Sequence, residues 1–304
     1  MAAPPEESAA IHTEGLTKAF GSLRAVDGLT MTVPRGEIFG FLGPNGAGKT
    51  TAVKMLVGLS APTSGGAWLL GKPIGDTPTR ARIGYLPELF RYQGWMSAFE
   101  VLHLHCQLAD LAAESHHSEV EKALVTVGLA DRAHDRVATF SKGMQQRLGL
   151  GVALLGNPEV VFLDEPTSAL DPVGRKDVRE IILGLKGRGI TVFLNSHLLS
   201  EVQQVCDRVA VVDRGRVVAS GPMQELLGEN RIRVELDGIK KEALAAAAPF
   251  GVVEQGEGWL TVSGIDREQV PDLVAALVAA GARISGVVRT QTTLEERFFQ
   301  ALER

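Results

Sequence analysis

The pattern of apolar and polar positions predicts alternating strands near the start of the chain and buried strands further along. Short alternating segments between Ile11 and about Gly36, such as Leu29–Val33, are separated by Gly and Pro turns and are typical of strands. Longer uninterrupted apolar runs are typical of strands that are buried on both faces. Such runs occupy residues 37–42, 160–163 and 190–195.

Helices are predicted between these apolar runs. One helix is expected to begin near Lys49, a helix-rich stretch covers about residues 96–156, and a charged helix precedes the run at 190–195. Strands at 209–213 and 216–219, joined at Arg214-Gly215, follow. Because strands alternate with helices, we expect an α/β fold with a mostly parallel sheet and helices packed on its faces.

The pattern changes after Gly221-Pro222. A short helix at about 223–228 leads to strands at 231–236 and 259–262, then to a helix at 266–280 with Asp266 as its cap. The capping-box pattern Thr293-Leu294-Glu295-Glu296 opens a final amphipathic helix. The expected divisions are a flexible tail at 1–10, a main domain at 11–227 with a helical subdomain at about 88–156, and a small α/β accessory domain at 228–304.

Composition indicates a soluble globular protein, with 45% hydrophobic and 22% charged residues among 304. No apolar run approaches the ~18–20 residues that span a bilayer, and residues 1–10 lack the basic and apolar regions of a signal peptide. We expect a cytoplasmic chain that another protein holds at any membrane on which it acts. The net charge of −5 gives no electrostatic reason to expect a nucleic-acid partner.

The cysteines and most histidines carry no clear chemistry. Cys106 and Cys206 lie far apart in predicted helical contexts and are expected to be reduced core thiols. His103 and Cys106 share a helix face at i, i+3, but His105 does not, so we do not expect a metal site there.

The segment GPNGAGKT matches the phosphate-loop pattern GxxxxGK[ST] between a buried strand and a helix. Small residues let successive backbone N–H groups converge on phosphates, and the helix N-terminus adds a favourable dipole. Lys49 can reach the β- and γ-phosphates, and the Thr50 hydroxyl can ligate Mg²⁺. An ordinary Gly-rich turn is the alternative. The expected nucleotide-binding residues are Gly43, Pro44, Asn45, Gly46, Ala47, Gly48, Lys49, Thr50 and Thr51.

The apolar run at 160–163 ends in two carboxylates, Asp164 and Glu165. Asp164 suits the holding of Mg²⁺, directly or through water. Glu165 can orient, or accept a proton from, the water that attacks a γ-phosphate. A solvated acidic turn is the alternative, but the phosphate loop in the same chain favours hydrolysis of a nucleoside triphosphate.

Further motifs occur in an informative order. They are Leu16-Thr17-Lys18-Ala19-Phe20-Gly21, Gly84-Tyr85-Leu86-Pro87-Glu88, Phe140-Ser141-Lys142-Gly143-Met144, Asp164-Glu165-Pro166-Thr167-Ser168-Ala169-Leu170-Asp171 and Asn195-Ser196-His197. With the phosphate loop they cover about residues 11–222, and by resemblance the chain is identified as a member of the ABC ATPase family.

The resemblance implies a P-loop NTPase cassette with a parallel-sheet core, an antiparallel β subdomain and a helical subdomain. Two cassettes would pair head to tail, with ATP and Mg²⁺ held between the phosphate loop of one and Ser141 and Gly143 of the other. Phe20 would stack on the adenine, and Asp171 would cross the dimer interface. His197 would contact the γ-phosphate and the attacking water; without the other motifs, a capping or core histidine would be the better interpretation.

Two positions depart from the family pattern. Glu88 stands where the family usually has Gln, so it can ligate Mg²⁺ but cannot donate a hydrogen bond. The signature reads FSKGM, with Lys142 in place of Gly and Met144 in place of Gln. Both variants, and the C-terminal extension, are similar to those of export subunits.

The resemblance implies an ATP-hydrolysing subunit at the cytoplasmic face of the membrane that energises a separate permease. A soluble ABC ATPase acting on ribosomes or chromosomes is the alternative, although such proteins usually carry two cassettes or long coiled-coil insertions. An unrelated P-loop kinase or GTPase is disfavoured by the FSKGM segment and His197. The transported substrate is not specified.

The segment 89–96 concentrates three aromatic residues, Phe90, Tyr92 and Trp95, in a chain poor in aromatics. Because aromatic and Arg side chains are common anchors of interfaces, we expect this segment to contact the permease. The alternative is that these rings pack into the local core.

Overall fold

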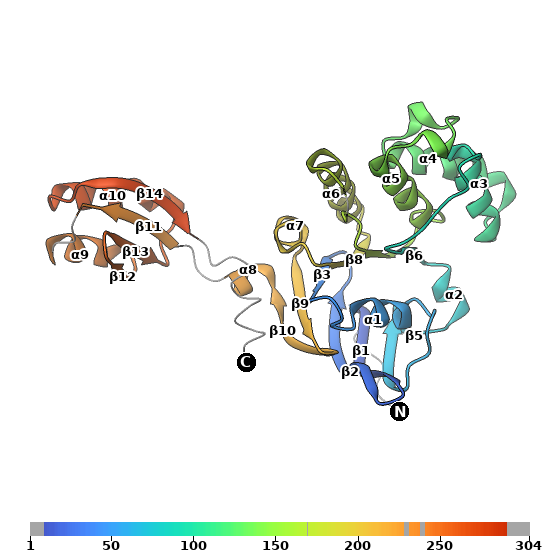
Figure 1. Cartoon of the computed structure of the whole chain (residues 1–304), viewed down its shortest axis with the longest axis horizontal. Helices are drawn as coiled ribbons and strands as arrows, with labels where there is room; N and C mark the ends of the chain where they lie inside the picture. Colours follow the sequence, from blue (N-terminus) through green and yellow to red (C-terminus); the bar gives the residue numbers. More distant parts are fainter. Residues whose placement is uncertain (1–8, 169, 228–230, 238–240, 291–304) are drawn as a thin grey trace. The chain divides into compact units, whose positions relative to one another are not determined.

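The structure is a computed structural model that describes residues 9–168, 170–227, 231–237 and 241–290. By their contacts, the residues form two units, Met1–Pro222 and Met223–Arg304. Figure 1 shows the elements and their labels.

The core of the first unit is a six-stranded sheet in which four of the five strand pairings are parallel. Only β10 runs antiparallel, as the second strand of a hairpin with β9. The mostly parallel sheet predicted from the sequence is therefore confirmed. In order across the sheet, its strands are β10 (Arg216–Pro222), β9 (Arg208–Asp213), β3 (Ile38–Leu42), β8 (Thr191–Ser196), β7 (Val160–Asp164) and β6 (Ile83–Leu86).

The central strands are buried along their whole length, as uninterrupted apolar runs predict. Phe193 on β8 lies at the centre of the core, with ring centroids 5.2 to 5.8 Å from Phe39, Phe41 and Phe162 on the flanking strands. These rings pack between the strands whose carboxyl ends carry the predicted site residues.

A second, antiparallel sheet of four strands packs in the same unit. Its strands, in order, are β2 (Leu23–Pro34), β1 (Ala9–Phe20), β4 (Ser64–Leu69) and β5 (Lys72–Pro73). The prediction of a flexible tail at 1–10 is wrong for its last two residues, because Ala9 and Ala10 are buried and belong to β1. The apolar side chains of this short stretch are covered by the sheet, which a local sequence pattern does not reveal.

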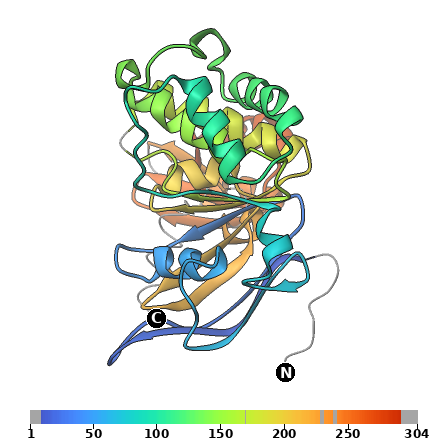
Figure 2. The ribbon, with the colours of Figure 1, turned by 90° about the vertical axis from the view of Figure 1, so that its right-hand side faces the viewer.

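Helix α1 (Lys49–Leu56) lies between the two sheets, and the larger helices cover the other face of the six-stranded sheet (Figures 1 and 2). The predicted helix start at Lys49 is confirmed. The helices on the other face are α3 (Ala98–Leu108), α4 (His116–Thr126), α5 (Lys142–Ala153), α6 (Pro172–Gly187) and α7 (Leu199–Val205), while α2 (Thr77–Arg80) precedes β6. The connections include the 3₁₀ turns Ala113–Ser115, Ala130–Arg132 and Val137–Thr139.

The second unit contains an antiparallel sheet with helices and its own apolar core. Its strands, in order, are β12 (Val252–Gly256), β13 (Trp259–Ser263), β11 (Arg231–Leu236) and β14 (Ile284–Thr290), and its helices are α8 (Met223–Leu227), α9 (Lys241–Ala247) and α10 (Val270–Ala279). Short 3₁₀ turns occupy Ala248–Phe250 and Arg267–Gln269. Strand and helix follow in the order βαββαβ, a recurrent small-domain motif.

One helix boundary in this unit was predicted wrongly. The α-helix expected at 266–280 begins at Val270, after a 3₁₀ turn, and Gln269 rather than Asp266 is its N-cap. Pro271 lies in the first turn, where its missing N–H is tolerated, and this fixes the start of the α-helix. The capping box predicted at 293–296 lies outside the described residues. None of the described helices has both the length and the apolar character that a membrane span requires.

Candidate functional site

The loop between β3 and α1 contains the residues predicted to bind phosphate. Gly46 and Gly48 have φ angles of 82° and 95°, which side chains rarely adopt. A Cβ atom at Gly48 would lie 2.0 Å from the carbonyl oxygen of Ala25, and one at Gly43 would lie 2.3 Å from that of Val212. The glycines therefore allow the loop to pass close to its neighbours and lead directly into the N-terminus of α1, where backbone N–H groups lack helical partners.

Lys49 reaches back across this loop. Its Nζ donates hydrogen bonds to the carbonyl oxygens of Gly43 at 2.8 Å and Pro44 at 3.2 Å. Burial lowers the pKa of Lys49, whereas the carboxylates of Glu165, Asp164 and Glu88 favour its charged form. The ammonium is thus held at the loop by weak carbonyl acceptors, which phosphate oxygens can replace with a stronger, charge-assisted bond.

Asp164 ends β7 beside Asn195, its register partner on β8. Its side chain is 1% exposed, and its Oδ1 accepts a hydrogen bond from Asn195 Nδ2. Burial raises the pKa of Asp164, the Asn195 hydrogen bond opposes this, and the carboxylates of Glu88 and Glu165 raise it further. Within the described part of the chain, Asp164 Oδ2 is buried without a hydrogen-bond partner.

An unpartnered buried carboxylate oxygen is costly, and a cation is a natural partner for it. The residues predicted to hold Mg²⁺ are Thr50 in the first turn of α1, Asp164, and Glu88 in the exposed loop after β6. No three His, Cys, Asp or Glu side chains converge on a common point among the described residues.

Glu165 directly follows β7 in an unusual backbone conformation. Its φ is 53°, its N–H donates to the carbonyl oxygen of Asn195 at 2.9 Å, and its side chain is buried. The Glu165 Oε2 lies 2.8 Å from His197 Nδ1, at the end of β8. A carboxylate only accepts, so Nδ1 carries the proton in this bond and the other ring nitrogen faces elsewhere. A backbone strain of this kind is typical of functional sites.

The signature segment FSKGM begins α5. Ser141 is the N-cap of this helix, where its Oγ accepts a hydrogen bond from Met144 N at 3.2 Å. Asp171 similarly caps α6 by accepting from Gly174 N at 2.8 Å. Both helix starts, together with Gly143, line a cavity of about 370 Å³. Asp171, predicted to cross a dimer interface, thus has a capping role within its own chain.

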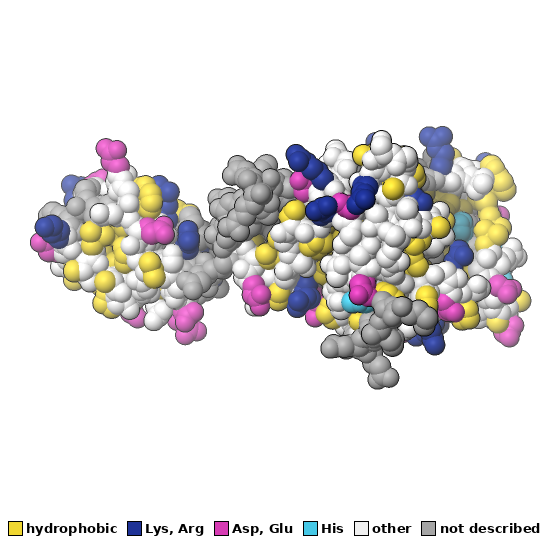
Figure 3. Space-filling model, turned by 90° about the horizontal axis from the view of Figure 1, so that it is seen from below, with side chains coloured by type: hydrophobic (Ala, Val, Ile, Leu, Met, Phe, Trp, Pro, Cys, Tyr) yellow, Lys and Arg dark blue, Asp and Glu magenta, His cyan; other side chains and the backbone are white. Residues whose placement is uncertain are grey.

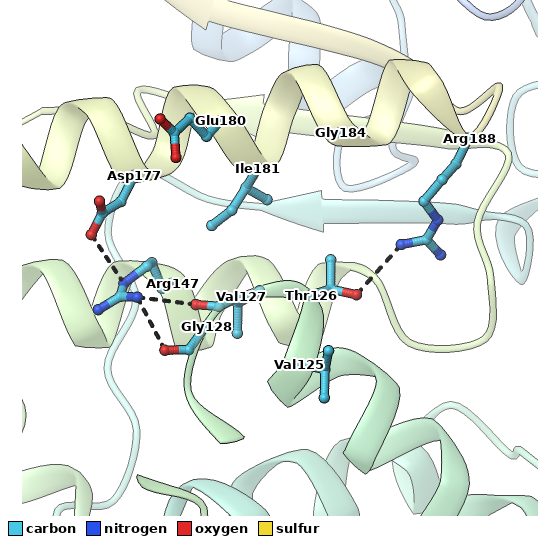
Figure 4. Close-up of a pocket in the computed structure, with 10 residues that line it drawn as sticks. All are labelled: Val125, Thr126, Val127, Gly128, Arg147, Asp177, Glu180, Ile181, Gly184 and Arg188. Carbon is cyan, nitrogen blue, oxygen red and sulfur yellow. Dashed lines mark hydrogen bonds and ion pairs between the residues drawn. The ribbon is translucent and has the colours of Figure 1, made fainter. Parts of the chain in front are cut away.

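Arg147 ties the signature helix to its neighbours (Figure 4). Its Nη1 donates to the carbonyl oxygens of Val127 and Gly128 after α4, at 3.3 and 3.2 Å, and its Nε lies 3.9 Å from Asp177 Oδ2 on α6. These contacts border a cavity of about 450 Å³ between α4, α5 and α6. Because none of the phosphate-loop residues line that cavity, we do not assign the nucleotide to it.

The remaining predicted positions lie at the surface. Phe20, at the end of β1, is 56% exposed with Lys18 Nζ 5.1 Å from its ring centroid. In the segment 89–96, Trp95 is 72% exposed, whereas the Tyr92 ring lies 5.3 Å from that of Phe90 and 5.5 Å from that of His105. Of the three aromatic residues, Trp95 is therefore the most exposed, whereas Phe90 and Tyr92 are partly buried.

Sequence reasoning assigned no role to Asn195. Its position at the carboxyl end of a buried strand, in register with Asp164, could have signalled one, because polar residues at that sheet edge gather at the site. The close approach of Ala25 to Gly48 had no local signal, since Ala25 lies on β2 and Gly48 lies in the loop between β3 and α1.

Comparisons with known proteins identify the family of the chain. A family model described as "ABC transporter" matches residues 26–168. An uncharacterised ABC transporter ATP-binding protein of Nostoc sp. is 40% identical, over 92% of this chain and 84% of the relative. A daunorubicin resistance ATP-binding protein of Streptomyces coeruleorubidus is 38% identical, over 95% of this chain and 94% of the relative.

The fold is likewise similar to solved structures. A structure described as the ATP-binding subunit of an ABC transporter superposes with a TM-score of 0.64 at 28% identity, over 71% of this chain and 91% of the other. These findings confirm the predicted cassette fold and do not favour a soluble ATPase acting on ribosomes or chromosomes, or an unrelated kinase or GTPase. The chain belongs to the family of ABC transporter ATP-binding subunits.

Proposed function

We propose that this chain hydrolyses ATP between two paired cassettes at the cytoplasmic face of a membrane and thereby drives export through a separate permease. One observation carries the proposal: the buried Glu165 carboxylate is hydrogen-bonded to His197. Both groups stand at the carboxyl ends of adjacent strands, next to Asp164 and beside a phosphate loop.

In this proposal the loop from Gly43 to Thr51 wraps the phosphates, Lys49 bonds the β- and γ-phosphate oxygens, and Phe20 stacks on the adenine. Thr50, Asp164 and Glu88 would hold Mg²⁺. When bound there, Mg²⁺ would neutralise phosphate charge, consistent with the unpartnered Asp164 oxygen.

Glu165 orients the attacking water and accepts its proton. The hydrogen bond from His197 Nδ1 holds the carboxylate in place and leaves the other ring nitrogen available to the γ-phosphate. Glu165 cannot rotate freely, because its backbone is bonded to Asn195 and its side chain to His197. The constellation is thus prepared before substrate binds.

Pairing of two cassettes would complete the site. Ser141 and Gly143 lie at the N-terminus of α5 and line an open cavity, so they are available to a γ-phosphate carried by another copy. Gly143 leaves the helix start uncovered, since the nearest atom to a Cβ there would be Ser141 Oγ at 3.9 Å. Asp171, in the same cavity, would contact the partner cassette.

Export is supported by a relative that is named for daunorubicin resistance and aligned over nearly its whole length. A nucleic-acid partner is not proposed. On the face shown in Figure 3, the described basic side chains lie interspersed with acidic ones, and the formal net charge is −5.

The proposal is tested by Glu165→Gln, which preserves shape and removes the proton acceptor. Phosphate release should fall ~10²–10⁴-fold, while ATP still binds and a dimer accumulates in size-exclusion chromatography with Mg-ATP. Lys49→Ala should weaken nucleotide binding and give no such dimer. Glu121→Gln, an exposed carboxylate on α4, is the matched control and should behave as the unaltered protein. Near-normal hydrolysis by Glu165→Gln would refute the assigned role and move it to His197.

A further inference from the structure

Three segments that are distant in the sequence meet beside the phosphate loop. They are Ala47-Gly48 of the loop, Ala25–Asp27 of β2, and the Arg214-Gly215 turn that joins β9 to β10. Gly215 N donates to the carbonyl oxygen of Ala47 at 2.9 Å, and Asp27 N donates to that of Gly215 at 2.9 Å. The turn is therefore bonded to the loop on one side and to β2 on the other.

The bond from Gly215 fixes the orientation of one peptide group in the phosphate loop. In a planar trans peptide, the carbonyl of Ala47 and the N–H of Gly48 point in opposite directions. Because the carbonyl is held toward the turn, the Gly48 N–H points away from it. That N–H is one of the donors on which a phosphate loop depends.

The turn has a geometry that admits only glycine at its second position. Arg214 and Gly215 have φ angles of 45° and 80°, the pair of positive values that a two-residue hairpin turn of type I′ requires. A Cβ atom at Gly215 would lie 2.9 Å from the Ala25 oxygen and 3.0 Å from Asp27 N. A side chain there would push the turn away from β2 and so disturb the bond from Gly215 N to the Ala47 oxygen.

Ion pairs at the surface stabilise the contact between this turn and β2. Arg216 donates to Asp27 Oδ2 from Nε at 2.9 Å and from Nη2 at 2.6 Å, and Arg24 Nη1 donates to Asp27 Oδ1 at 2.9 Å. These hydrogen bonds lower the pKa of Asp27, and the largest effect comes from Arg216. The carboxylate is therefore charged at neutral pH. Asp27 is thereby fixed by three side-chain bonds and one backbone bond.

We propose that the Arg214-Gly215 turn, locked by Asp27 and Arg216, is a positioning element that orients the phosphate loop and sets the affinity for ATP. The inference rests on the proposed function only in taking the loop as the ATP site. Asp27 and Arg216 lie outside the predicted phosphate-binding residues; they act through the Ala47 carbonyl.

The test compares Gly215→Ala with Gly71→Ala in the full-length protein. Gly71 has the same left-handed backbone conformation, with φ of 81°, but no atom lies within 4 Å of a Cβ placed there. Equilibrium binding of a fluorescent, non-hydrolysable ATP analogue should weaken about three- to ten-fold for Gly215→Ala, the loss expected for one misoriented hydrogen bond, and less than two-fold for Gly71→Ala. The kcat at saturating ATP should change by less than two-fold, because Glu165 and His197 are not moved.

A second pair of variants covers the case in which Gly215→Ala does not fold. Asp27→Asn should weaken binding of the analogue, whereas Arg216→Lys, which keeps the charge, should retain most of it. Glu159→Gln breaks a comparable surface ion pair, formed with Arg35 and Arg82 just before β7. This variant should leave the affinity for the analogue unchanged.

Equal affinities for Gly215→Ala and Gly71→Ala would overturn the inference, as would a fall in kcat with unchanged affinity. Binding of this analogue involves no hydrolysis. A wrong assignment of Glu165 would therefore leave these results unchanged, and the two proposals fail separately.

Discussion

Asp164 and Glu165 show that the site holds functional groups in costly states. Asp164 is a buried carboxyl whose pKa burial raises and whose second oxygen has no hydrogen-bond partner among the described residues. Glu165 has a left-handed backbone that few residues other than glycine adopt. Both features oppose the stability of the nucleotide-free protein and favour binding of a charged ligand, a trade-off that is common in active sites.

This trade-off can be measured with Asp164→Asn. The amide keeps the shape and can still accept the hydrogen bond from Asn195 Nδ2. Removing a buried charge should stabilise the nucleotide-free protein, and each 1 kcal/mol gained raises Tm by roughly 2–4 °C in a domain of this size. The stabilisation by Mg-ATP should be lost, because the variant lacks the negative charge that attracts Mg²⁺. Thermal denaturation with and without Mg-ATP measures both effects.

Asp135→Asn is the control for this experiment, since Asp135 is exposed and paired with Arg132 on the surface. Its Tm should stay within about 1 °C, because exposed ion pairs contribute little. A lower Tm for nucleotide-free Asp164→Asn would contradict the view that the buried carboxylate is destabilising.

At the scale of elements, the sequence predicted those strands and helices whose pattern is local. The uninterrupted apolar runs form β3, β7 and β8, and the helix after the phosphate loop begins at the predicted residue. The predicted nucleotide-binding and acidic residues follow these strands, and the sheet brings Asp164 and Asn195 together in register. The roles assigned to the site residues stay predictions.

Elements with weak local patterns were not predicted. Strand β6 has only four residues and contains Gly84, which faces the next layer so closely that a Cβ would lie 1.8 Å from the Ala153 oxygen on α5. A glycine that serves close packing between layers reads locally as a strand breaker. The β4–β5 hairpin, whose second strand has two residues, gave no periodic signal either. Such elements depend on tertiary packing more than on their own sequence.

The loop 89–96 connects β6 to the helical subdomain, and its exposed side chains bear on the predicted permease contact. Leu89 and Trp95 are 88% and 72% exposed, while Phe90 and Tyr92 pack against one another. Trp95 also lines a cavity of about 260 Å³ with Phe99 and Leu104. We therefore expect the predicted contact to involve Trp95 and Leu89 more than Phe90 and Tyr92.

We expect cysteines that replace Leu89 or Trp95 to crosslink to cytoplasmic loops of the permease in membranes that contain both chains. Trp95→Ala should reduce transport while ATP hydrolysis by the isolated subunit is kept, because Trp95 lies outside the phosphate-binding residues. A cysteine replacing Leu183, an exposed apolar residue on α6, is the control and should not crosslink. Absence of crosslinks from both loop positions, with intact ATPase activity, would argue against this contact.

At the scale of the whole molecule, the chain is built from two units with separate apolar cores. The core of the first unit joins the two sheets around α1 and includes side chains from Ala10 to Val212. That of the second unit is formed by β11, β13, α9 and α10, with fully buried members such as Val234, Leu260 and Leu273. Because the two cores share no residue, each unit has the interior that independent folding requires.

This division makes the role of the second unit testable, since all residues assigned to ATP binding and hydrolysis lie in the first. Truncation after Leu227 keeps α8, which follows β10 directly, and removes the whole second core. The affinity for ATP should change by less than about two-fold, because no group that contacts nucleotide is lost. Dimer stability or transport should change if the unit supports dimerisation or regulates coupling, as we propose.

The matched variant for the truncation is Leu273→Asp in the full-length chain. A charge in this fully buried position should unfold the second unit while the first unit keeps its own melting transition. If both variants alter dimer formation or transport alike, the folded second unit is responsible, rather than chain length. A truncated protein that is folded by circular dichroism yet no longer binds ATP would show that the boundary is wrong, and that residues beyond 227 support the nucleotide site.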